Sequence, residues 1–295
     1  MKNADKVTTY PNILLLGNGI NRCFDNDSWQ KVIENIIKES KTNINFNDIC
    51  GIPATMQIVL ASNDHVDKYM KEFASKLLNN RLEDKQKEIL CDLLDMNFDS
   101  ILTTNYSYEL ELASNIKQSL NSFYSCRNWT KKDLTKKEKK MHLYEYNNAK
   151  NNKIWHIHGD ICTSSSIVIG HYYYGKLLSE IEKYCSTLIA RHKNTNYEYK
   201  YNSWVDYFVT SNIYILGFSL DLSETDLWWL LCYKHRHFND TNAYFYQPDK
   251  DLTYDKRLML ETYGVTVKDN IQLKDNDYFD YYNCAIKDIK RYLNV

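Results

Sequence analysis

Apolar runs and turn signals alternate from the start of the chain. The apolar run at residues 12–16 ends abruptly in Gly17-Asn18-Gly19, a pattern typical of a buried parallel strand that enters a tight turn. Asp27 or Ser28 can then begin a helix, because five apolar residues follow with the spacing of one helical face: Trp29, Val32, Ile33, Ile36 and Ile37. The sequence therefore predicts a strand, a glycine turn and a helix in series.

Short apolar strands alternate with helical stretches along the rest of the chain. Strands are predicted at residues 100–104, around 142–146, and at 153–158, 167–169, 212–218, 243–246 and 265–267. Helices are predicted within about 55–97, and at 109–117, 173–191, 203–210, 223–230 and 277–293. This alternation predicts an α/β fold, a doubly wound and mostly parallel Rossmann-like sheet with helices on both faces.

Two helical stretches, about 30–97 and 172–210, are too long to be simple crossovers between parallel strands. We interpret them as helical insertions that cover one end of the sheet. The sequence contains no internal repeat and no low-complexity linker. We therefore expect residues 1–295 to form a single domain with these two insertions.

Charge and composition narrow the class of protein. The 37 Lys and Arg residues stand against 38 Asp and Glu, a formal net charge of -1, so we expect no direct nucleic-acid binding. The N-terminus is too polar for a signal peptide, and the longest apolar stretch, 227–233, is far shorter than the ~20 residues that span a bilayer. The eight Cys residues form no CxxC pair, which excludes a zinc ribbon. We expect a cytoplasmic protein that does not associate with membranes.

The first candidate site is the glycine turn at residues 17–19. Glycines after a strand allow the backbone to approach a pyrophosphate, whose oxygens the N–H groups can bind. A dehydrogenase fingerprint requires a third glycine where this chain has Arg22, which argues against an ordinary Rossmann dehydrogenase. Arg22 could itself pair with a phosphate, and the alternative is a plain tight turn.

Polar residues also follow two later strands. Asn105, in the run Thr103-Thr104-Asn105, offers an acceptor and donors for a ribose hydroxyl, an amide or a water, at the strand end where open α/β sheets bind ligands. The alternative is a helix N-cap or an Asx-turn. Farther along, Gly217 permits close approach of the backbone, and the hydroxyl of Ser219 can bond to a ribose or phosphate oxygen.

The run Trp155-His-Ile-His-Gly-Asp160 is the third candidate. His158 at a strand end before a glycine can act as a general base near neutral pH. One alternative is metal binding by the H-x-H-x-D pattern, although Ile161 stands where metal hydrolases with this run generally have a further His. Another alternative is a buried structural pair of histidines.

Three acidic residues follow the loop that contains Gly217 and Ser219. We interpret Asp221, Glu224 and Asp226 as helix-capping and first-turn acids that favour the positive end of the helix dipole. Ser223 and Asp226 have the spacing of a capping box.

The order of these motifs, GNG, TTN, HIHGD and ILGFSL, resembles the sirtuin-like superfamily, in the branch of bacterial NAD-hydrolysing antiphage effectors. The resemblance extends from about Ile13 to Val267 and includes the connecting phrases IVIGHYYYGK (167–176) and SETDLWW (223–229). It implies an NAD glycohydrolase that cleaves NAD to nicotinamide and ADP-ribose and acts in abortive infection.

The resemblance also implies roles for individual residues. Asn105 matches the residue that positions the nicotinamide ribose and the attacking water, and His158 matches the catalytic histidine. Residues expected to bind NAD are Gly17, Asn18, Gly19, Asn21, Thr104, Gly217, Phe218 and Ser219. NAD is then the substrate, and no metal is expected.

Two departures from the family pattern bear on the activity. Sirtuin deacylases carry a four-Cys zinc module, and its Cys pairs are missing here, which makes protein deacylation doubtful. Ser107 stands where family members usually have Asp, so this chain binds nicotinamide less tightly or uses another residue. An NAD-dependent deacylase and a non-catalytic NAD or ADP-ribose sensing module remain the alternatives.

The implied activity also implies regulation, since uncontrolled NAD hydrolysis kills the cell that makes the enzyme. We expect a separately encoded sensor or regulatory protein from the same operon, or assembly into a homo-oligomer, to control the reaction.

Overall fold

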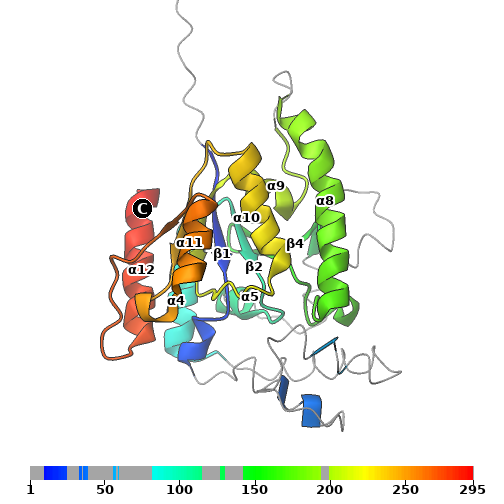
Figure 1. Cartoon of the computed structure of the whole chain (residues 1–295). Helices are drawn as coiled ribbons and strands as arrows, with labels where there is room; N and C mark the ends of the chain where they lie inside the picture. The colour runs from blue at the N-terminus through cyan, green and yellow to red at the C-terminus, as the bar shows by residue number, and fades with distance from the viewer. Residues whose placement is uncertain are drawn as a thin grey trace, which may run out of the picture.

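The computed structural model describes residues 10–24, 33–34, 36–38, 56–57, 59, 82–114, 127–129, 142–193 and 199–294. A sheet forms its centre (Figure 1). Its eight strands lie in the order β3-β4-β5-β2-β1-β6-β7-β8. The strands are β1 (Asn12–Leu16), β2 (Ser100–Thr103), β3 (Arg127–Trp129), β4 (Glu145–Ala149), β5 (Asn152–His156), β6 (Asn212–Leu216), β7 (Ala243–Tyr246) and β8 (Val265–Val267). The six strands from β5 to β8 in this order are parallel, and β3 and β4 form an antiparallel edge.

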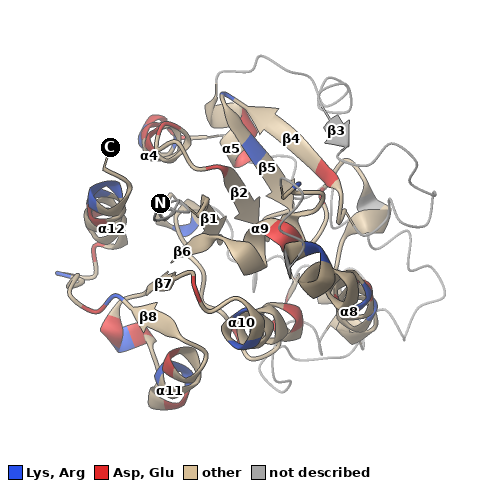
Figure 2. Cartoon of the chain, turned by 90° about the horizontal axis from the view of Figure 1, so that it is seen from above, with Lys and Arg blue, Asp and Glu red and all other residues tan. Residues whose placement is uncertain are grey.

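Helices cover both faces of the sheet, as Figure 2 shows from above. On one face lie α4 (Asp84–Leu94), α5 (Glu109–Ala113) and α12 (Tyr278–Leu293). On the other lie α8 (His171–Lys193), α9 (Trp204–Thr210), α10 (Thr225–His237) and α11 (Tyr254–Thr262). Short 3-10 helices are η1 (Asn21–Cys23), η3 (Ser164–Ser166) and η4 (Asp249–Asp251). The prediction of a doubly wound, mostly parallel α/β sheet is confirmed.

The position of β1 at the centre of the sheet explains why its sequence is apolar without interruption. Ile13 and Leu15 point into the core under α8, α9 and α10, whereas Leu14 and Leu16 point into the core under α4 and α12. All four side chains are buried, because β1 pairs with β2 on one side and β6 on the other and both of its faces are covered.

Several predicted elements differ from the structure. Residues 167–169 are a buried extended loop rather than a strand: Val168 donates its N–H to the carbonyl oxygen of His158 at 2.8 Å, outside the sheet. The strand predicted around 142–146 is β4, which begins at Glu145. The helix predicted at 109–117 ends at Ala113 as α5, and residues 115–117 lie outside the described residues.

The two predicted insertions are described to different extents. Trp29, Val32 and most of the stretch 30–97 lie outside the described residues. Ile33, Ile36 and Ile37 are helical and buried, and α4 is the last helix of this stretch. In the second stretch, α8 and α9 pack against α10 and the sheet. Within the described ranges, no helix is both long enough and apolar enough to cross a membrane.

A single buried carboxylate organises the start of α9. Asp206 is fully buried and accepts hydrogen bonds from the N–H groups of Asn202 and Ser203, at 2.6 and 2.9 Å. Its oxygens also accept from the Tyr184 hydroxyl at 2.5 Å and from the Arg191 guanidinium at 3.0 Å. This carboxylate therefore ties α8 to the N-terminus of α9.

We predict that Asp206→Asn lowers the free energy of unfolding by about 2–3 kcal/mol, because an amide cannot accept this set of donors and leaves Arg191 without its counter-charge. Urea denaturation followed by circular dichroism measures the change. The matched variant Asp240→Asn, at an exposed position, should unfold like the wild type. Equal stability of the two variants would show that Asp206 does not organise this junction.

Candidate active site

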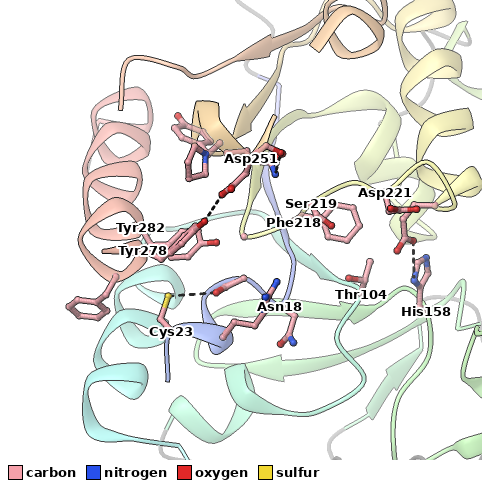
Figure 3. A pocket seen from close by; sticks show the side chains of 18 of the residues that line it. Asn18, Cys23, Thr104, His158, Phe218, Ser219, Asp221, Asp251, Tyr278 and Tyr282 are labelled. Atoms are coloured by element: carbon pink, nitrogen blue, oxygen red, sulfur yellow. Dashed lines mark hydrogen bonds and ion pairs between the residues drawn. The ribbon is translucent and has the colours of Figure 1, made fainter. Parts of the chain in front are cut away.

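The loops after the parallel strands surround a cavity of about 1000 Å³. Residues that follow β1, β2, β5, β6 and β7 line it, together with the beginning of α12. Figure 3 shows His158 and Asp221 at one end, Cys23, Tyr278 and Tyr282 at the other, and Thr104, Phe218 and Ser219 between them. The cavity is therefore elongated along the edge where the strands end.

Two glycine loops meet in the middle of this edge. The N–H of Gly17 donates to the carbonyl oxygen of Leu216 at 3.0 Å, and the N–H of Gly19 donates to that of Gly217 at 2.6 Å. A Cβ atom on Gly17 would lie 2.4 Å from the Gly217 oxygen, and Gly217 itself has a φ of +65°. These glycines are needed because the two backbones touch. The N–H groups of Gly17 and Gly19 bind protein carbonyls.

Seven of the ten predicted site residues line the large cavity: Asn18, Gly19, Thr104, His158, Gly217, Phe218 and Ser219. Gly17, Asn21 and Asn105 do not. Asn21 and Asn105 instead border a second cavity of about 10 Å³, together with Ser107 and Glu109. The structure thus brings most of the predicted residues together and divides them between two neighbouring spaces.

Asn105 is held by its backbone. Its N–H donates to the Thr103 hydroxyl at 3.1 Å, and its carbonyl oxygen lies 2.7 Å from Nδ1 of His156. Nε2 of His156 lies 2.9 Å from Glu111. The buried Oδ1 of Asn105 has no hydrogen-bond partner among the described residues. The small cavity beside it has room for about one water molecule.

His158 is the most constrained polar side chain of the large cavity. It is 2% exposed, and its Nε2 lies 2.9 Å from an oxygen of the fully buried Asp226. Its Nδ1 lies 3.8 Å from Glu224, and the ring of Tyr174 packs edge-on at a centroid distance of 5.3 Å. Burial alone would lower the pKa of His158, but the charges of Asp226 and Glu224 outweigh it and raise this pKa. The imidazole is thus held in one orientation.

Glu224 and Asp226 stand at the start of a helix, as predicted, but their side chains face His158. Helix α10 begins at Thr225 with Glu224 at its N-cap, and no side-chain hydrogen bond caps it. The predicted capping box of Ser223 and Asp226 is therefore wrong, because Asp226 turns inward to His158. Sequence reasoning missed Glu224, Asp226 and Tyr174 as site residues. The position of the two acids directly after a glycine loop at a strand end was the available signal.

The H-x-H-x-D run does not converge as a metal site would. His156 bonds to Glu111, His158 bonds to Asp226, and Asp160 accepts from the Tyr108 hydroxyl at 2.7 Å. Within the described ranges, His158, Glu224 and Asp226 have potential ligand atoms within 4.8 Å of one another. A cation there would have to replace the hydrogen bond between His158 and Asp226.

Aromatic rings distinguish the end of the cavity opposite His158, whereas acidic residues lie at both ends. In the part of the chain that the structure describes, Arg22 is the one Lys or Arg that lines it, against four carboxylates: Asp221, Glu224, Asp251 and Asp277. Tyr278 and Tyr282 lie at the end opposite His158, and Tyr246 and Phe279 also line the cavity. This end offers flat apolar ring surfaces with hydroxyl groups at their edges.

The buried pair of His156 and Glu111 predicts a dependence of stability on pH. Burial opposes the charged imidazole, but the charge and hydrogen bond of Glu111 raise the pKa of His156 to about 9. A raised histidine pKa contributes stability below the unfolded value of about 6.5, and this contribution is lost as the pH rises through the folded value. The free energy of unfolding of the wild type should therefore fall between pH 6.5 and pH 9.5. In His156→Gln this fall should be smaller than in the wild type by about 1 kcal/mol or more. Urea denaturation at both pH values measures this, and parallel profiles would contradict it.

The model of the SIR2-like domain family matches residues 99–268, more than half of the chain. The matched region begins directly before β2 and ends after β8, and it contains Asn105, His158, Gly217 and Ser219. A search of curated proteins finds no match to this chain. Because this match covers more than half of the chain, the chain belongs to the SIR2-like domain family, whose members use NAD as a substrate.

Proposed function

We propose that this protein is an NAD glycohydrolase, which cleaves the bond between nicotinamide and ribose and releases ADP-ribose. The observation that carries the proposal is the buried imidazole of His158, held by Asp226 at one end of an elongated cavity in a SIR2-like fold. We expect the nicotinamide ribose at this end and the adenosine at the aromatic end near Tyr278 and Tyr282. The paired glycine loops would then lie beside the pyrophosphate.

The chemistry of the proposed reaction suits this environment. Loss of nicotinamide leaves positive charge on the ribose ring, so carboxylates that face the ring stabilise the transition state more than the ground state. His158 would bond to ribose hydroxyls at the buried end. Asn105 would orient the attacking water through its carboxamide, whose Oδ1 has no partner among the described residues. Thr104 and Tyr106 on either side of Asn105 line the large cavity.

Incubation of the purified chain with NAD, followed by chromatography of the nucleotides, tests the proposal. We expect nicotinamide and ADP-ribose to form without any acylated peptide. NAD consumption that requires an acyl-lysine peptide would indicate a deacylase. NAD that binds and stays intact would indicate a sensing module.

We predict that His158→Gln and Asn105→Ala each lower kcat at least about 100-fold. Glutamine at position 158 can still donate a hydrogen bond to Asp226, which limits damage to the fold. His235→Ala, at an exposed position on α10, is the control and should keep wild-type activity. Thermal melting of each variant separates lost chemistry from lost folding, and a folded variant with near-normal turnover would exclude its residue from catalysis.

The carboxylates of the cavity predict a preference between the two common dinucleotides. A 2′-phosphate on the adenosine ribose adds negative charge near Asp251 and Asp277, with Arg22 as the one opposing Lys or Arg among the described lining residues. We expect kcat/KM for NADP to be at least about 10-fold below that for NAD, with a smaller ratio at high salt. Equal values for the two substrates at low salt would contradict this assignment of the adenosine end.

We further propose that the activity serves abortive infection in antiphage defence and is controlled by a separately encoded sensor or regulatory protein, or by homo-oligomerisation. This follows from the reaction itself, because continuous NAD loss is lethal. Co-expression with the products of neighbouring genes, followed by NAD measurement and size-exclusion chromatography, tests both forms of control. Full activity of the monomeric chain alone would overturn this part of the proposal.

A further inference from the structure

We propose that Glu224 is a catalytic residue of this site, whose carboxylate receives the proton of the attacking water while His158 binds the ribose. This inference rests on the proposed function and names a residue that none of the sequence motifs assigned to catalysis.

The geometry at the buried end of the cavity separates the two acids. Asp226 is fully buried and its Oδ2 is engaged by Nε2 of His158 at 2.9 Å, so it holds the imidazole and does not line the cavity. Glu224 does line the cavity, and its side chain is 19% exposed. Of the two carboxylates, Glu224 is therefore the one that a substrate or water molecule in the cavity can reach.

The neighbours of Glu224 hold its carboxylate in place. The Tyr174 hydroxyl donates to Oε2 at 3.1 Å, and Nδ1 of His158 lies 3.8 Å from the same oxygen. These two contacts come from α8 and from the loop after β5, whereas Glu224 itself precedes α10. Both contacts are made to Oε2, so neither of them occupies the other oxygen, Oε1. A carboxylate fixed in this way needs little reorganisation to accept a proton.

The proposed step conserves atoms and charge. The bond between C1′ of the ribose and the nicotinamide nitrogen breaks, and its electron pair neutralises the positively charged ring, which leaves as nicotinamide. The water oxygen forms the new bond to C1′, and one water proton moves to the carboxylate of Glu224. Glu224 then releases this proton to solvent, so the products are nicotinamide, ADP-ribose and one proton.

The charges around Glu224 favour a base that works near neutral pH. Burial raises the pKa of Glu224 to about 7, with His158 opposing the rise and Asp226 and Asp221 adding to it. The other titratable groups that face it are the hydroxyls of Tyr174 and Tyr106, whose pKa values lie well above the usual value and which stay neutral at pH 7. A general base is most effective when its pKa lies near the working pH.

The experiment compares the full-length wild type with Glu224→Gln, Glu224→Ala and the control Glu261→Gln, an exposed acid on α11. NAD turnover is measured between pH 5.5 and 9, and NAD binding is measured by calorimetry. We expect Glu224→Gln to lower kcat at least about 100-fold, with NAD affinity changed by less than about 5-fold. The wild-type kcat should fall as the pH drops below about 7, because the base becomes protonated, and this limb should be absent in Glu224→Gln.

Added formate distinguishes a proton acceptor from a structural residue. Formate can occupy the space left in Glu224→Ala and should restore part of its kcat, whereas it should not affect Glu261→Gln. A Glu224→Gln variant that keeps more than a tenth of wild-type kcat would overturn the role of Glu224 and leave the proposed function standing. The role of Glu224 would also be overturned if its variants lost NAD binding as much as they lost turnover and formate did not restore the kcat of Glu224→Ala. Wild-type protein that binds NAD and never cleaves it would overturn the proposed function, and this role with it.

Discussion

The hydrogen-bonded register between β1, β2 and β6 is the constraint on which the cavity depends. Leu16 lies opposite Thr103 on one side and Leu216 on the other, so the three strands end at the same level. Further pairings place His156 and Tyr246 in the same row. Every loop that leaves this row emerges at one edge, and for this reason residues far apart in sequence line a single space.

Direct contact between two of these loops determines the shape of that space. Because the backbones after β1 and β6 bond to each other, any side chain at Gly17 would collide with the Gly217 carbonyl. The contact brings Asn18 and Phe218 to the middle of the cavity and leaves its two ends chemically different. One end contains a buried imidazole with carboxylates around it, and the other contains tyrosine rings beside the carboxylate of Asp251.

Buried charge is tolerated at this edge because it is paired. His156 with Glu111 and His158 with Asp226 each place an imidazole within 2.9 Å of a carboxylate, and in both cases the partner outweighs the cost of burial. The two histidines belong to the same short run of sequence but serve different neighbours. His156 holds the backbone of Asn105, whereas His158 reaches the cavity.

The sequence by itself determined the α/β architecture and seven of the residues that line the large cavity. The unbroken apolar character of β1 and the turns that follow β1 and β6 are local signals, because burial on both faces and glycine conformations act within a few residues. The extended loop at 167–169 shows the limit, since its apolar residues are typical of a strand and only the hydrogen bond to His158 decides otherwise. Only the tertiary structure decided that Asp226 turns to His158, that Tyr174 meets Glu224, and that Asn105 borders the smaller cavity. The first two contacts join residues 68 and 50 positions apart, and no local pattern specifies which partner a polar side chain finds across such a distance.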